Sequence, residues 1–119
     1  MEDSRILVLV SNTFTTAKQT SEQSRAVSML KTHRYPFDVV DGSDPCNKEI
    51  RNQLFRVSGV RGQYPQFFLV DNRGVPTYIG DFETIEAIND ASTLPEEVLK
   101  EYPAITTWNK LFAGEGIIH

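Results

Sequence analysis

The chain has 119 residues, of which 39% are hydrophobic and 24% are charged, and its formal net charge is −4. This length and composition fit one globular domain with a single core. The acidic balance and the lack of a basic stripe argue against a nucleic-acid partner. The first residues, MEDSRILVLVSN, hold too short an apolar run for a signal peptide or a membrane span, so we expect a cytoplasmic protein without a membrane partner.

The chain has one cysteine, Cys46, so no disulfide can form within it. No cysteine and histidine residues have the spacing of a zinc site, and His33 and His119 have no companions, so we expect no metal. Cys46 lies near the start of a predicted helix. It is either a small helix residue or a reactive thiol.

The first third of the chain predicts a strand, a helix and a second strand. Residues 5–10, RILVLV, form a continuous apolar run that is typical of a strand covered on both faces. Apolar residues at helical spacing, with cations near the end, predict a helix over about residues 16–32. Residues 36–41, PFDVVD, predict the second strand.

A second helix is expected to begin at Asp44, which serves as the N-cap before a proline at the first helical position. Ile50, Leu54 and Val57 would form its apolar stripe. The pair Ser58-Gly59 ends it.

The next segment predicts a β-hairpin followed by a helix. Residues 66–70 and 75–79 read as strands, and DNRG between them has the composition of a tight turn. A third helix is expected to start at Asp81. The early strand–helix–strand unit requires parallel strands, whereas the hairpin is antiparallel. These elements predict a thioredoxin-like fold, with a mixed four-stranded sheet between two layers of helices.

The remainder of the chain predicts a helical extension. We assign residues 1–92 to the domain and residues 93–119 to an extension packed on or near it. Thr93 and Glu96 fit a capping box, and Gly114 is a natural helix stop. Trp108, Leu111 and Phe112 form an apolar helix face, which either docks on the domain core or binds a partner.

Pro65 precedes a strand that looks buried, and two interpretations are open. It is a trans proline that blunts a strand entry, or it is the cis-proline of a thioredoxin-like fold. In the second case Tyr64 would present its main chain to a bound peptide, which would pair with it as a short strand.

The span from Arg5 to about Asn89 resembles glutaredoxin. It more closely resembles the SH3-domain-binding glutamic-acid-rich-like proteins, which are redox-inactive relatives of glutaredoxin. The segments that carry the resemblance are YIGDFETIEAIND (78–90), RILVLVSNTFTTAKQ (5–19) and YPQFF (64–68).

The resemblance implies that the redox chemistry of glutaredoxins is absent. Thr15 takes the position of their nucleophilic cysteine, and Lys18 takes that of the resolving residue. A threonine hydroxyl does not form the thiolate that thiol–disulfide exchange requires. Thr13, Thr15 and Thr16 could equally be ordinary helix-capping residues.

The resemblance also implies a place where glutathione would bind. Asp81 and Phe82 match the helix start that receives its γ-glutamyl end, and Arg61 would hold the other carboxylate. Asp81 is alternatively an N-cap without a ligand. Gly80 stands alone where glutaredoxins usually place two glycines.

The sequence therefore predicts a redox-inactive adaptor or scaffold without a catalytic residue or cofactor. A peptide or protein partner would bind at a groove formed by Thr15, Lys18, Tyr64, Pro65 and Asp81. One alternative is a protein that binds glutathione, or an oxidoreductase or transferase of atypical activity that uses it. A further alternative is a subunit held in an assembly through residues 106–112. GQYPQFFL contains no P-x-x-P, so an SH3 partner is not expected.

Overall fold

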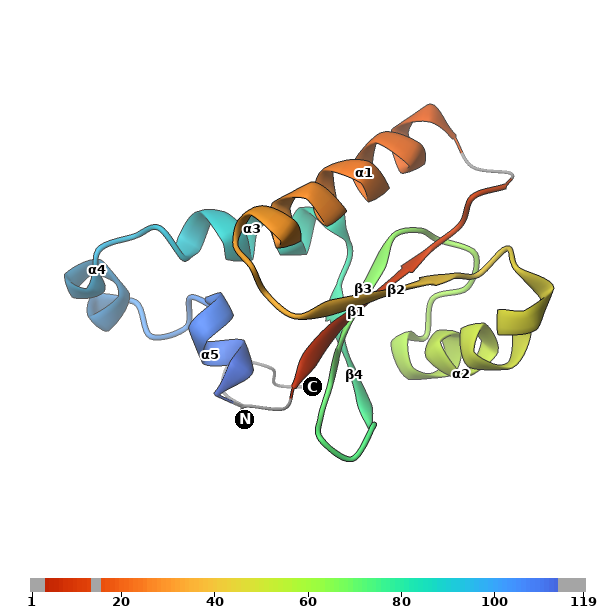
Figure 1. The fold of residues 1–119 in the computed structure, drawn as a ribbon. Coiled ribbons are helices and arrows are strands. Elements are labelled where there is room, and N and C mark those ends of the chain that lie inside the picture. Colours follow the sequence, from red (N-terminus) through yellow and green to blue (C-terminus); the bar gives the residue numbers. More distant parts are fainter. Residues whose placement is uncertain (1–3, 14–15, 114–119) are drawn as a thin grey trace.

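The computed structural model describes residues 4–13 and 16–113. Within these ranges the chain forms an α/β fold with one mixed four-stranded sheet and five α-helices (Figure 1). The elements in chain order are β1 (Arg5–Val10), α1 (Ala17–Thr32), β2 (Phe37–Asp41), a 3₁₀ turn (Pro45–Asn47), α2 (Lys48–Ser58), β3 (Gln66–Val70), β4 (Pro76–Gly80), α3 (Phe82–Ala91), α4 (Glu96–Glu101) and α5 (Trp108–Phe112).

The strand order in the sheet is β2-β1-β3-β4. β1 and β2 are parallel, and the β1–β3 and β3–β4 pairs are antiparallel. This confirms the predicted mixed sheet with an early parallel pair and a late hairpin. None of the helices in the described ranges has both the length and the apolar character needed to cross a bilayer.

Helices cover both faces of the sheet, which explains the continuous apolar run of β1. Ile6, Val8 and Val10 point to the face covered by α1, α3 and α5, where Leu30 and Ile85 also lie in the larger core cluster. Successive side chains of a strand point to opposite faces. Leu9 accordingly packs with Leu54, Phe55 and Phe68 in a smaller cluster beneath α2.

The C-terminal helix α5 contributes to the main core. Trp108 and Leu111 are each 1% exposed and belong to the same cluster as Ile6 and Ile85. The rings of Trp108 and Phe112 lie 5.0 and 5.5 Å from the ring of Tyr35, which follows α1. The end of the chain up to residue 113 therefore packs on the domain rather than standing apart from it.

The two edge strands of the sheet are β2 and β4, and the outer side of β2 follows from its hydrogen bonds to β1. Ile6 N donates to Pro36 O and Gly42 N donates to Val10 O, so alternate residues between them face β1. The main-chain groups of Phe37, Val39 and Asp41 consequently face outward.

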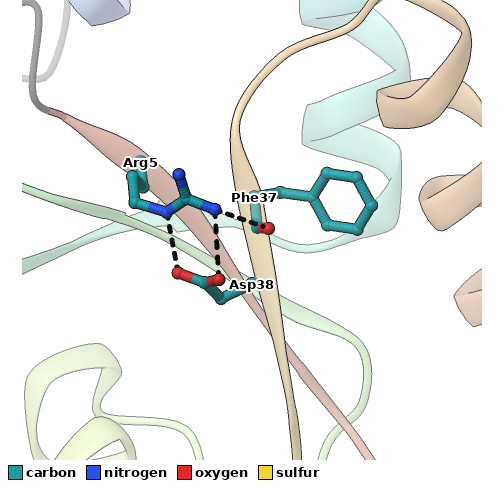
Figure 2. Close-up of polar contacts among 3 residues, drawn as sticks. All are labelled: Arg5, Phe37 and Asp38. Carbon is teal, nitrogen blue, oxygen red and sulfur yellow. Dashed lines mark hydrogen bonds and ion pairs between the residues drawn. The ribbon is translucent and has the colours of Figure 1, made fainter.

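Side chains and turns occupy both ends of the β2 edge. Figure 2 shows the Arg5 guanidinium, which donates to both carboxylate oxygens of Asp38, at 2.9 and 3.1 Å, and to Phe37 O at 3.1 Å. At the other end, Asp41 O accepts from Asn47 Nδ2 and from Asp44 N.

Two details of the predicted helices are wrong. Thr93 and Glu96 form no capping box, because α4 begins after Pro95 and Thr93 Oγ1 instead donates to Asp90 O at the end of α3. The predicted stripe of the second helix is also misplaced. Ile50 and Val57 are 38% and 40% exposed, and Phe55 is buried beside Leu54 in their stead. Gly114 lies outside the described residues.

Candidate functional site

The candidate site is a small pocket where the starts of α1 and α3 meet the loop before β3. Its volume is about 90 Å³. α1 contributes Lys18 and Glu22. The lining residues from the loop are Gln63, Tyr64 and Pro65, and those from the start of α3 are Asp81, Phe82 and Glu83. We call this hollow the proline pocket.

The sequence analysis proposed seven residues for the groove and for glutathione binding, and the structure brings five of them together in the proline pocket. They are Lys18, Tyr64, Pro65, Asp81 and Phe82. Arg61 is not among the residues that line it. Its guanidinium carbon lies 5.7 Å from the ring centroid of Phe55, on the α2 side of the loop. Thr15 lies outside the described residues.

The peptide bond between Tyr64 and Pro65 is cis, so the cis alternative for Pro65 is confirmed. Pro65 is buried, and the Tyr64 ring packs against Phe55 with the ring centroids 6.0 Å apart. Burial raises the pKa of the Tyr64 phenol above its ordinary value, although the charge of Arg51 opposes this and that of Asp41 adds to it.

The main-chain groups of Tyr64 have no partner among the described residues. Neither its N–H nor its C=O makes a hydrogen bond to another described residue. The neighbouring strand β3 begins only at Gln66, whose partner in β1 is Leu9. Tyr64 therefore offers a donor and an acceptor at the proline pocket that the sheet does not use.

Gln66 holds the loop that carries Tyr64, and the sequence analysis did not identify this role. Its side chain is 1% exposed, and its Nε2 donates to Val60 O at 2.9 Å and to Gln63 O at 2.8 Å. Its Oε1 is buried without a hydrogen-bond partner among the described residues. The sequence signal was a polar residue at the first position of an otherwise apolar strand.

Replacing Gln66 by leucine should lower the free energy of unfolding by about 1–3 kcal/mol, because two carbonyl groups lose their buried donor. Chemical denaturation would measure the cost, and amide shifts in a ¹⁵N spectrum should concentrate between Val60 and Tyr64. Gln53, which is exposed on α2, provides the matched control through the same substitution. Equal costs at positions 66 and 53 would contradict this role.

Asp81 is the N-cap of α3, as the sequence predicts. Its Oδ1 accepts from both Thr84 N and Thr84 Oγ1, each at 3.0 Å. Gly80, before it, has φ +155°, and a Cβ there would lie 2.6 Å from the Thr84 side chain. The turn from Gly80 to Thr84 therefore has no space for a side chain at position 80. Asp81 Oδ1 already accepts hydrogen bonds from Thr84.

A second hollow has a volume of about 330 Å³, and Tyr64 lines it as well as the proline pocket. Its lining includes Ser11 and Thr13 from the loop after β1, and Gly42 and Ser43 from the loop after β2. Gln19, Arg51 and Gly62 complete its lining. The sequence signal for it was the polar residues at the carboxyl ends of two strands that proved to be parallel neighbours.

Asp41 organises the wall of this second hollow. Its carboxylate accepts hydrogen bonds from the main chain and side chain of both Asn12 and Ser43. Burial opposes ionisation of Asp41, but these hydrogen bonds outweigh it, so its pKa lies below the ordinary value. Arg51 Nη1 donates to Gly42 O at 3.3 Å and connects α2 to the loop after β2.

Cys46 is exposed and lines neither hollow. Its main-chain N–H donates to Asp44 Oδ1, which confirms Asp44 as a cap. Within residues 4–13 and 16–113, no three acidic, histidine or cysteine side chains are grouped as a metal site. Two larger surface hollows, of about 490 and 630 Å³, contain none of the residues that the sequence analysis proposed for the groove.

No protein-family model matches the chain, and no curated protein matches it. Among solved structures, it is similar to Actin interacting protein 5 (wild type) at 17% sequence identity, with a TM-score of 0.54. The similarity covers 84% of this chain and 92% of that one. At this identity the likeness supports the fold alone, a small α/β fold with a mixed sheet.

Proposed function

We propose that the chain is a thioredoxin-like module without redox activity, and that it binds an extended segment of a partner protein at Tyr64. The strand order β2-β1-β3-β4, with its parallel first pair and its hairpin, supports the thioredoxin-like assignment. The resemblance to the SH3-domain-binding glutamic-acid-rich-like proteins supports the redox-inactive role, since Thr15 replaces the nucleophile and Cys46 is the one cysteine of the chain.

The observation that carries this proposal is the main chain of Tyr64, which lies beside the proline pocket and has no hydrogen-bond partner among residues 4–13 and 16–113. A residue with a free N–H and a free C=O can exchange two hydrogen bonds with one residue of an extended peptide. Recognition by strand addition draws its affinity from such main-chain bonds and its specificity from adjacent side-chain pockets. Tyr64 lines both the proline pocket and the second hollow, which would serve as those pockets.

Titration with a library of extended heptapeptides, followed by ¹⁵N amide spectra, tests the proposal. We expect the largest shifts at Tyr64, Phe82 and Glu83, and none on the outer face of α2. For a binding peptide, N-methylation of the residue opposite Tyr64 should weaken affinity about fivefold to tenfold, because it removes one main-chain hydrogen bond.

N-methylation of the next residue supplies the matched control. Its N–H points away from Tyr64 in an extended chain, so the affinity should hardly change. Equal losses at both positions, or shifts confined to other surfaces, would refute main-chain recognition at Tyr64.

Glutathione is the alternative ligand at the same place, since Lys18, Asp81 and Phe82 gather around Tyr64. The volume of about 90 Å³ is well below the several hundred Å³ that small-molecule sites usually enclose. The lining also holds three carboxylates, which oppose a ligand that carries two of its own. These features favour a peptide over glutathione, and glutathione added to the same titration would distinguish them.

Actin interacting protein 5 is, by its name, a protein that interacts with actin. At 17% identity the likeness supports only the fold, so the proposal does not include actin as a partner.

A further inference from the structure

The following inference rests on the proposed function. If a partner segment binds at Tyr64, the charges around this residue indicate which side chain that segment carries. We propose that the partner segment bears a lysine or arginine, whose cationic end enters the proline pocket while its main chain pairs with Tyr64.

The lining of the proline pocket is acidic. Glu22, Asp81 and Glu83 supply three carboxylates, and Lys18 supplies one ammonium group. The second hollow, which Tyr64 also lines, has Arg51 in its lining and no carboxylate. The carboxylates that line a hollow beside Tyr64 therefore all belong to the proline pocket, while the Asp41 carboxylate near the second hollow is held by hydrogen bonds from Asn12 and Ser43.

None of the carboxylates of the proline pocket forms an ion pair within the described part of the chain. Glu22 is half-buried and Glu83 is exposed, and neither has a hydrogen bond or an ion pair to a described residue. Lys18 lies one helical turn from Glu22 but forms no ion pair with it. A half-buried carboxylate without a partner is attracted to a cation more strongly than a fully hydrated one, because the screening by water is weaker there.

The start of α3 does not offset this preference. A helix N-terminus favours anions, but the first turn of α3 already contains Asp81 and Glu83. Asp81 Oδ1 accepts from Thr84 N, which satisfies one of the N–H groups that an anionic ligand would need. A carboxylate from a partner would meet three carboxylates and an N-terminus that is already capped.

The size of the pocket fits the end of a basic side chain. At about 90 Å³ it is too small for a whole peptide residue with a large ring, but it admits an ammonium or guanidinium group with its last methylenes. Pro65 and Phe82 also line the pocket, but both are buried and the surface that the pocket exposes is mostly polar, which suits a charged group. Long basic side chains place their methylenes along apolar surface and keep the charged end among polar groups.

The test uses a positional-scanning library of acetylated and amidated heptapeptides, with the full chain in a fluorescence polarisation assay. Each position carries lysine, arginine, glutamine, norleucine or glutamate. We expect one position to prefer lysine or arginine over norleucine by about fivefold to tenfold. Glutamate at that position should bind least.

Charge-altering variants test whether this pocket is the source of the preference. The double variant Glu22→Gln, Glu83→Gln should reduce the preference for lysine over norleucine to less than twofold, and Glu22→Lys, Glu83→Lys should reverse it toward glutamate. Glu49→Gln, in the first turn of α2 outside both hollows, is the matched control and should keep the full preference.

The outcomes separate this inference from the proposed function. Peptides that shift the Tyr64 amide without any charge preference would overturn the cationic pocket and leave main-chain recognition intact. A charge preference that survives in the glutamine double variant would also overturn it. If no peptide shifts the Tyr64 amide, both this inference and the proposed function fail.

Discussion

Replacing Trp108 by alanine should lower the free energy of unfolding by about 3–5 kcal/mol, the usual cost of deleting a large buried aromatic side chain. The Trp108 side chain is 1% exposed and lies in the main core with β1 and α3. Its ring is 5.0 Å from that of Tyr35, and its main-chain N–H donates to Ser92 Oγ at 3.0 Å. Urea denaturation monitored by far-UV circular dichroism would measure the loss.

Two further variants keep this prediction testable. Trp108→Phe keeps much of the apolar volume and should cost less than the alanine variant, which provides a measurement if the latter does not fold. Tyr102→Ala removes an aromatic ring that is 58% exposed and should change stability by about 0.5 kcal/mol or less. If Trp108→Ala costs no more than Tyr102→Ala, the last helix is not part of the core.

Replacing Gly80 by alanine should lower the free energy of unfolding by about 2–4 kcal/mol and should disturb the proline pocket. The Gly80 φ of +155° is a conformation that L residues rarely adopt, and the new methyl group would lie 2.6 Å from Thr84. Thr84 is also the residue that binds the capping oxygen of Asp81. The amide signals of Asp81, Phe82 and Glu83 should therefore shift together with the loss of stability.

Gly74→Ala separates the two causes of this cost. Gly74 also has a positive φ, of +80°, but nothing lies within 4 Å of a Cβ placed there. The Gly74→Ala variant should lower the free energy of unfolding by about 1 kcal/mol, because only the backbone conformation opposes it. A double-mutant cycle of Gly80→Ala with Thr84→Gly should show a favourable coupling, because the second change removes the clash. Equal costs at positions 80 and 74, or strict additivity in the cycle, would contradict the packing argument.

Most of the fold could be predicted because its signals are local. The apolar run of β1, the turn sequence between β3 and β4, and the caps at Asp44 and Asp81 each depend on residues close in sequence. The errors arose where tertiary contacts decide. Periodicity alone does not show that α2 buries Phe55 rather than Ile50, since the rotation of the helix depends on the sheet beneath it.

The candidate site was predictable only in part, for the same reason. Tyr64, Pro65, Asp81 and Phe82 lie next to strand and helix ends, so their meeting follows from the order of elements. Arg61 was proposed from its closeness in sequence, but its side chain turns back over Phe55 after α2 ends at the left-handed Gly59. The contribution of Glu22 and the support from Gln66 depend on distances between elements, which the sequence does not give.

The contacts of Arg5 and Asn47 at the β2 edge affect how readily copies of this molecule would associate through their sheets at high concentration. Unpaired strand margins are templates on which proteins polymerise. Here the guanidinium of Arg5 covers Phe37 O (Figure 2), and the amide of Asn47 covers Asp41 O. A strand that approaches β2 has to displace both. A polypeptide that binds at Tyr64 has no such contact to displace among the described residues, so strand addition should be easier there than at the β2 edge.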